Sequence, residues 1–285
     1  MRCSHSSAMR LVLVGFALAA TGCGTTLSTL QPAEPMRPGH VQVTAAMDVN
    51  VPVSRVIDAV DESATLSQRY ASDPSFKPNE DEQRRFLNAG VGLGLAASGP
   101  NPDLMLRAGI FKNFDAGIRW SAINAHVDAK YRFLQTKDTP EEDPDADPGF
   151  QGAVSLGVSK SLYSGFVFDT LEYLKIDDYS RWNIEVPVIF GTRLGNFGHA
   201  WFGPKYVYSH YSVDASLKNV GIVPETSGSI HYFGAFAGAG VGYKYIFVFL
   251  EMTVANMIAK PEILGQKVDL GGIVVVPSLG LMLRI

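Results

Sequence analysis

The chain has 285 residues, of which 46% are hydrophobic, and a formal net charge of −4. This surplus of acids argues against a nucleic-acid partner, because proteins that bind nucleic acids neutralise phosphates with Lys and Arg. Two cysteines in a chain of this length exclude a disulfide-based scaffold.

Residues 1–23 have the features of an export signal. Two arginines precede a short apolar run, and small residues then lead to Cys23. The segment resembles the lipobox of bacterial lipoproteins, which implies cleavage before Cys23 by lipoprotein-processing enzymes and lipidation of its thiol. An ordinary signal peptide is the alternative. The other cysteine, Cys3, lies in the discarded segment. Loss of residues 1–22 removes two arginines and no acid, so the net charge moves from −4 to −6.

The next segment is short and has the composition of a linker. Residues 24–39 are rich in Thr, Ser, Pro and Gly. Such a composition is typical of flexible chains. We therefore predict a flexible tether over residues 23–39, between the lipid and a single domain over residues 40–285.

Alternation of apolar and polar residues dominates that domain and predicts β-strands. Several strands reach about 10 residues, the length that crosses a bilayer at a tilt, whereas soluble strands are usually about half as long. Glycines at 238, 240 and 242 share one face, as on a concave inner wall. Tyrosines near strand ends favour a membrane barrel with aromatic girdles. A soluble sandwich or lipocalin-like barrel is the alternative, since alternation alone does not separate the two.

The last eight residues, SLGLMLRI, carry a motif. Ser278, Gly280, Leu283 and Ile285 match the C-terminal signal of bacterial outer-membrane β-barrels, although that family usually ends in an aromatic residue. The hairpin over 107–120 also looks like many barrel hairpins of this kind. The resemblance implies a closed antiparallel transmembrane β-barrel whose last strand pairs with its first. It also implies the barrel assembly machinery and outer-membrane lipids as partners.

The strand count has two solutions, because single-chain bacterial barrels have even numbers of strands. Eleven segments alternate well; we expect a twelfth strand at 166–175. Ten strands is the alternative, with 40–85 as a separate periplasmic element. The eleven segments are 40–51, 86–97, 103–112, 115–123, 126–134, 150–159, 182–193, 199–211, 230–242, 246–256 and 271–285.

The twelve-strand arrangement places the long connections outside. These connections are 52–85, 135–149, 212–229 and 257–270. Within them, 54–70 has the pattern of a short helix. It could cap the mouth or fold into the lumen as a partial plug, but a solvated loop helix is expected. Residues 138–147 carry six acids and two prolines. This acidic stretch lacks the spacing of a calcium loop, so a self-repelling loop is expected.

One pair of residues has the pattern of a catalytic site. His210 and Ser212 form an H-x-S pair, similar to the histidine base and serine nucleophile of barrel lipid hydrolases and deacylases. They lie among tyrosines and lack the asparagine that follows in that family, so a structural role and a non-enzymatic protein are expected. No metal site or cofactor is predicted.

A charged row on one strand marks the predicted lumen. His126, Asp128, Lys130 and Arg132 alternate with apolar residues, and Glu185 and Lys205 are expected nearby. Such groups can line a narrow channel for small polar solutes, or they can pair and seal a structural barrel that presents surface loops. The sequence leaves both functions open, in a lipid-anchored protein of the outer membrane of a diderm bacterium.

Overall fold

The computed structural model describes most of the sequence, and every regular element described below is a β-strand. The described residues are 26–52, 79, 82, 99–121, 124–137, 147–161, 174–217, 221–222, 226–260, 262–263, 266–267 and 269–285. Ten long strands form the wall: β1 (Val41–Pro52), β2 (Gly99–Phe111), β3 (Phe114–Ser121), β4 (Asn124–Gln135), β5 (Phe150–Ser161), β6 (Leu174–Leu194), β7 (Gly198–Leu217), β9 (Thr226–Tyr243), β10 (Ile246–Ala259) and β13 (Gly272–Arg284). Three two-residue strands, β8 (Gly221–Ile222), β11 (Glu262–Ile263) and β12 (Gln266–Lys267), lie in the connections.

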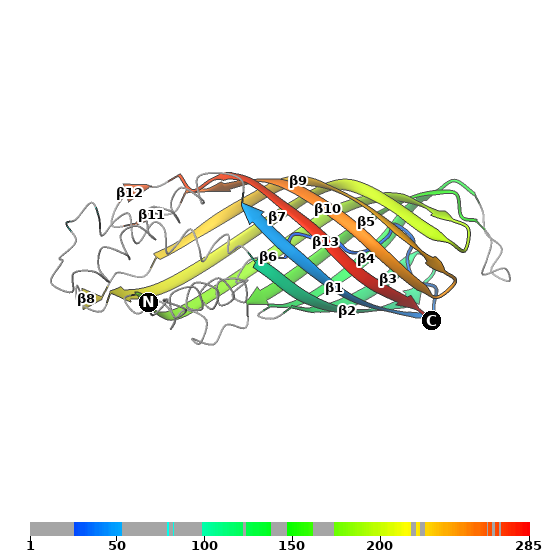
Figure 1. Ribbon diagram of the computed structural model, residues 1–285, viewed down its shortest axis with the longest axis horizontal. Coiled ribbons are helices and arrows are strands. Elements are labelled where there is room, and N and C mark those ends of the chain that lie inside the picture. Colours follow the sequence, from blue (N-terminus) through cyan, green and yellow to red (C-terminus); the bar gives the residue numbers. More distant parts are fainter. Residues whose placement is uncertain are drawn as a thin grey trace, which may run out of the picture.

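The ten long strands form one closed antiparallel ring (Figure 1). Each strand pairs with its neighbour in the chain, and β13 pairs with β1 through the register Gln42↔Arg284 to Pro52↔Val274. Closure leaves no unpaired edge in the wall. The fold is therefore all-β and a closed antiparallel barrel, as the sequence predicts, and the last strand meets the first.

The barrel has ten strands, which corrects the expected count of twelve. Strand β1 pairs directly with β2 from Asn50↔Gly99 onward, and β5 pairs directly with β6. No place in the wall remains between these partners for an additional strand at 86–97 or 166–175, and Leu174 and Lys175 are the first residues of β6. Residues 86–97 lie outside the described residues, as does 166–175 up to residue 173. The ten-strand alternative was right in number, but residues 41–52 form a wall strand rather than a separate periplasmic element.

The outer surface of the wall is apolar. Along β10, every second residue from Ile246 to Ile258 is exposed, and the residues between them are buried. Four phenylalanine rings contact one another across β4, β5, β6 and β7 near one end of the barrel, with centroids 6.0–6.5 Å apart. These are Phe133, Phe150, Phe190 and Phe202. An apolar outer wall with an aromatic girdle is the pattern of a transmembrane β-barrel, and the closed ring has this pattern.

The two ends of the barrel differ in their connections. Turns of two or three residues join β2 to β3, β6 to β7 and β9 to β10 at the end where β13 finishes. Most long connections, including 53–98, lie at the other end. Short turns face the periplasm in this class of barrel, so the first end is the inner mouth. Among the described residues, no helix is long and apolar enough to cross a bilayer.

One long connection lies at the inner mouth instead of outside. The ten-strand order makes β4 run inward, so the link between Gln135 and Phe150 falls at the end with the short turns. The prediction that 135–149 is an outer loop is therefore wrong. Its acidic stretch lies outside the described residues except for Asp147, which pairs with the exposed Lys137. The predicted helix at 54–70 also lies outside them.

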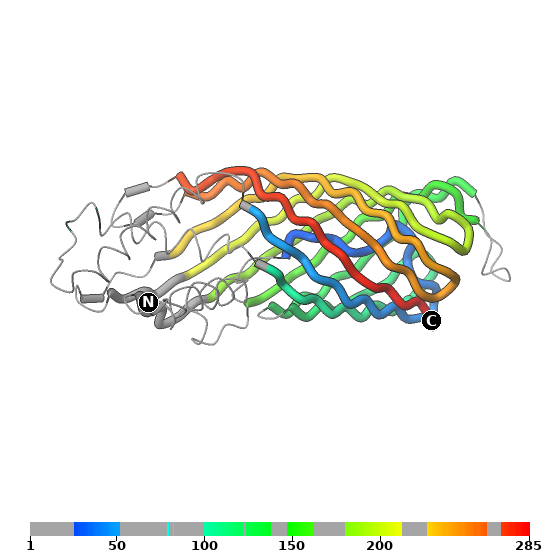
Figure 2. The backbone as a smooth tube through the Cα atoms, viewed as in Figure 1, coloured from blue at the N-terminus to red at the C-terminus, as the bar shows by residue number. Residues whose placement is uncertain are grey.

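A segment that precedes β1 runs inside the barrel (Figure 2). All residues from Thr26 to Met36 are buried. At the inner mouth the chain turns through Gly39, which has φ +80°, and enters β1. The composition of residues 24–39 predicts a flexible tether, but residues 26–36 of that segment are buried in the lumen. We call residues 26–36 the plug.

Candidate functional site

The plug is extended and irregular, so its backbone groups need partners from the wall. Glu251 on β10 accepts hydrogen bonds from the backbone N–H groups of Thr29, at 2.5 Å, and Leu30, at 2.8 Å. Asp115 on β3 accepts from the N–H of Met36 at 2.8 Å. Pro32 and Pro35 have no N–H group, which lowers the number of donors to satisfy. Wall carboxylates therefore replace the partners that a strand or helix would supply.

Cationic side chains of the wall donate hydrogen bonds to the carbonyl groups of the plug. Lys205 donates to the carbonyl oxygen of Leu27 at 2.6 Å. Arg119 donates to that of Ser28 at 2.9 Å. Lys130 donates to the carbonyl of Pro32 at 3.0 Å and to that of Glu34 at 3.3 Å. Hydrogen bonds to charged groups are worth about 1.5–3 kcal/mol each, so these contacts hold the plug firmly.

An apolar cluster surrounds the middle of the plug. Leu30 is fully buried and belongs to the same cluster as Ala33, Trp201 and other luminal side chains. Trp201 lies against Gly238, where a Cβ atom would come within 2.5 Å of the indole ring. The luminal glycine therefore leaves room for a large side chain. This agrees with the prediction that glycines sharing one face of this strand lie on the inner wall. The remaining members of the cluster are Met105, Ile189, Phe236, Phe247, Phe249 and Met282.

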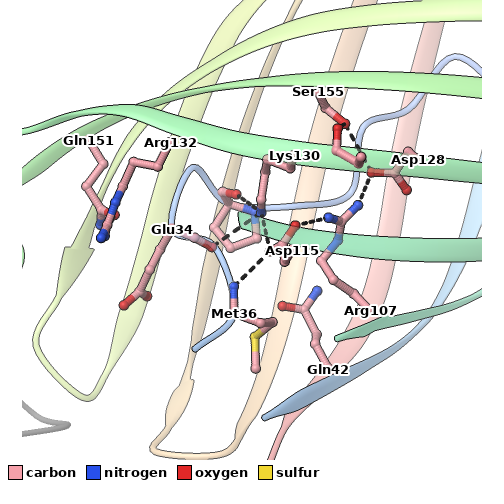
Figure 3. A network of polar contacts seen from close by, with 12 residues as sticks. Glu34, Met36, Gln42, Arg107, Asp115, Asp128, Lys130, Arg132, Gln151 and Ser155 are labelled. Atoms are coloured by element: carbon pink, nitrogen blue, oxygen red, sulfur yellow. Dashed lines mark hydrogen bonds and ion pairs between the residues drawn. The ribbon is translucent and has the colours of Figure 1, made fainter. Parts of the chain in front are cut away.

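A charged network lies on β2, β3 and β4 beside the plug (Figure 3). Arg107 pairs with Asp115 and Asp128. Lys130 lies 3.4 Å from Asp115, and Ser155 donates to Asp128 at 3.0 Å. Because Asp115 also accepts from the plug, the network joins three wall strands to residue 36. These charges therefore form pairs between neighbouring strands on the inner face of the wall.

The structure brings the predicted luminal residues to the inner face but divides them into separate contacts. Lys205 lies 2.9 Å from Glu185 as well as binding the plug. His126 lies 3.8 Å from Asp128. Arg132 turns toward the inner mouth, where it donates to Gln151 at 2.9 Å and to Asn113. Only Lys130 and Lys205 of the predicted set bind the plug directly among the contacts described.

Glu34 fixes the plug at the inner mouth. Its carboxylate accepts a hydrogen bond from Arg284 at 2.9 Å and lies 3.5 Å from Arg193 and 4.0 Å from His199. Burial raises the pKa of Glu34, but the positive charges of Arg284 and Arg193 outweigh it, and the pKa is lowered to about 2. Glu34 is therefore ionised, and the last strand holds the plug through Arg284.

The four residues of the C-terminal motif have distinct positions on β13 and at its end. Ser278 is buried in the lumen, opposite Asp48 and Glu251. A Cβ at Gly280 would come within 2.5 Å of the ring of Phe249, so glycine is needed there. Leu283 pairs with Val43 on β1. Ile285 is exposed, and its carbonyl oxygen accepts from the N–H of Val41 at 2.8 Å.

The candidate catalytic pair lies on the outer surface of the wall. His210 is exposed and Ser212 is partly exposed, two residues along the same face of β7. In the register, His210 lies opposite Trp182 on β6 and Ser229 on β9. Neither residue faces the lumen, and the absence of enzymatic activity stays a prediction.

Several wall residues that bind the plug, or that pair with a residue that does, were not singled out from the sequence. Glu251 is a single acid inside the apolar run IFVFLEMTVANMIA, at an inward position of the period-two pattern. Arg107, Asp115 and Arg119 occupy inward positions of the predicted hairpin. Isolated charges in strongly alternating strands were the available signal. Glu34 gave none, because it lies in a segment with the composition of a linker.

No family model matches the chain, and no curated protein matches it. Solved structures with some likeness include Neisserial surface protein A (10% identity, TM-score 0.32, covering 86% of this chain and 95% of that chain). Ail, the attachment invasion locus protein of Yersinia pestis, is also 10% identical (TM-score 0.31, 87% and 99%). The translocator domain of the autotransporter NalP from Neisseria meningitidis is 9% identical (TM-score 0.36, 98% and 98%). The strand register itself, not these values, establishes the closed ring.

Proposed function

We propose that the protein is a sealed structural barrel of the outer membrane that presents surface loops, with its own plug closing the lumen. The observation that carries the proposal is the binding of the plug backbone by charged residues from several parts of the wall. Glu251, Asp115, Lys130 and Lys205 lie on four different strands. A channel for small polar solutes, the other function expected from the charged row, requires a continuous water path that the plug occupies.

The wild-type barrel should be electrically silent. We expect purified protein in a planar bilayer to show no discrete conductance steps, because the plug and the paired charges fill the lumen. Heat-modifiable mobility in gels would establish that the same sample is folded. Reproducible ion-selective steps from the folded wild-type protein would contradict the sealed state and favour a channel.

We also propose that Cys23 carries a lipid anchor, as its resemblance to a lipobox implies. Cys23 precedes Thr26 by three residue steps, which span at most about 11 Å. A lipid on Cys23 would therefore be coupled to the position of the plug. In cells that produce the full chain, we expect labelled palmitate to be incorporated into the wild type and lost in Cys23→Ser. Equal labelling of both proteins, or no labelling of the wild type, would refute the anchor.

A further inference from the structure

A cluster of buried polar side chains lies in the lumen beside the outward end of the plug. Its five residues come from β13, β1 and β2, and each is at most 5% exposed. Six of their side-chain oxygens and both of their amide nitrogens have no hydrogen-bond partner among the described residues. Buried polar groups in proteins are nearly always hydrogen-bonded, so this number of unpaired atoms in one place indicates a bound species. We call these residues the oxygen cluster: Ser278, Asp48, Asn50, Asn101 and Asp103.

The strand register places the oxygen cluster on one patch of the inner face. Asp48 lies opposite Ser278 on β13 and opposite Asn101 on β2. Asp103 lies two residues beyond Asn101 and points to the same face, and Asn50 lies two residues beyond Asp48, nearer to the outer mouth. Directly opposed Cβ atoms are about 4.5–5.5 Å apart, and diagonal neighbours are about 7–8 Å apart. Side chains at these spacings can hold one ion between them, because Ca²⁺ takes oxygen ligands at about 2.3–2.6 Å.

One negative charge of the cluster has no cationic partner. Asp103 lies 3.6 Å from Arg119, which also donates to the plug carbonyls of Ser28 and Thr26. Asp48 accepts a hydrogen bond from the hydroxyl of Ser28. Within the part of the chain that the structure describes, Asp48 forms no ion pair, and it is close enough to Asp103 for the two charges to repel each other. Buried charges in proteins are paired or bind metals, so a positive ion would complete the cluster.

We propose that Asp48, Asp103 and Asn101 bind a divalent cation of the Ca²⁺ type, which reaches them from the outer side of the plug. Ca²⁺ takes about six to eight oxygen ligands in flexible geometry, from carboxylates, amide carbonyls and water. The described residues contain no group of three or more His, Cys, Asp or Glu side chains that could hold a metal ion. A set of two carboxylates and an amide therefore suits a hard cation and not a transition metal. Because Asp48 also binds Ser28, the cation would fix the outward end of the plug, as Glu34 fixes the inner end.

Calorimetric titration of the full chain with CaCl₂ tests the proposal. The protein is folded in neutral detergent with a chelator, freed of the chelator and titrated. We expect one saturable site in the wild type, in the range of about 10⁻⁴–10⁻³ M typical of extracellular calcium modules. Asp48→Asn should weaken binding about tenfold or more, since even indirect partners of a metal are worth that much. Asp269→Asn, at an exposed acid of the same end of the barrel, is the matched control and should bind like the wild type.

A second variant separates coordination from charge. Asn101→Ala removes a neutral oxygen and should also weaken binding, and it keeps the proposal testable if Asp48→Asn does not fold, as judged by gel mobility. Failure of the folded wild type to bind Ca²⁺ would overturn the proposal, and water or a shared proton would then satisfy the cluster. Unchanged affinity in both cluster variants, or an equal loss in Asp269→Asn, would also overturn it and assign the binding to other acids. The titration measures binding and not conductance, so its outcome is distinguishable from that of the sealed-barrel test.

Discussion

Removal of the plug should turn a silent barrel into a conducting one. Deletion of residues 26–36 takes away an extended segment that is buried along its whole length, whereas the wall begins at Val41 and is paired on both sides. Lys130, Lys205 and Glu251 then lose their partners on the plug and face water. We expect discrete conductance steps in planar bilayers, where the wild type shows none.

A matched deletion controls for the loss of chain length. Removing residues 60–70 takes the same number of residues from the connection between β1 and β2, and this variant should remain silent. A plug-deleted barrel that folds, as judged by gel mobility, and still shows no steps would contradict the plug as the seal. The ion pairs around Arg107 and Asp115 would then be the barrier.

Replacement of Glu251 should produce the largest loss of stability among single substitutions in the lumen. Its carboxylate accepts from the N–H groups of Thr29 and Leu30 and from the indole N–H of Trp201, at 2.8 Å. Glu251→Leu would leave these three donors buried without this acceptor, at about 1–3 kcal/mol for each buried group. We expect a decrease in the free energy of unfolding of about 3–5 kcal/mol. Urea titration in lipid vesicles, followed by tryptophan fluorescence, measures it.

Two comparisons separate the role of Glu251 from general damage to the lumen. Glu251→Gln keeps one acceptor oxygen and should lie between the wild type and Glu251→Leu. In the plug-deleted barrel, two of the three donors are gone, so Glu251→Leu should cost much less there. Equal costs with and without the plug would show that the carboxylate stabilises the wall alone.

Alternation predicted the wall well because it depends on a simple local rule, namely that inward and outward residues alternate along each strand. The predicted number of strands was wrong partly because of residues 86–97. There Ala89, Val91 and Leu93 alternate with glycines, which is the pattern of a strand. Only the pairing of β1 with β2 excludes this segment from the wall, and pairing is a non-local property. The charged row on β4 was correctly predicted to face the lumen. The residues on other strands that pair with it could not be identified from the sequence.

The plug was beyond prediction for a different reason. Its Thr, Ser and Pro residues have no periodicity and weak structural preference, so the segment looks like a linker. Its order comes from acids and bases far away in the chain, such as Lys205 and Glu251. An extended segment can thus be fixed entirely by its surroundings. In the sequence, the wall residues that bind such a segment can be recognised only as charged residues at inward positions of the strands.

The position of the plug also constrains the order in which the molecule folds. Thr29 meets Glu251 across 222 residues of chain, and Glu34 meets Arg284 across 250. Contacts this distant in sequence form late, because long loops must close before they are gained. The plug lies within a ring that closes only when β13 pairs with β1, so it must be enclosed as the ring seals or enter afterwards through a mouth. In either case, the segment that comes before every strand reaches its final contacts only after the last strand is in place.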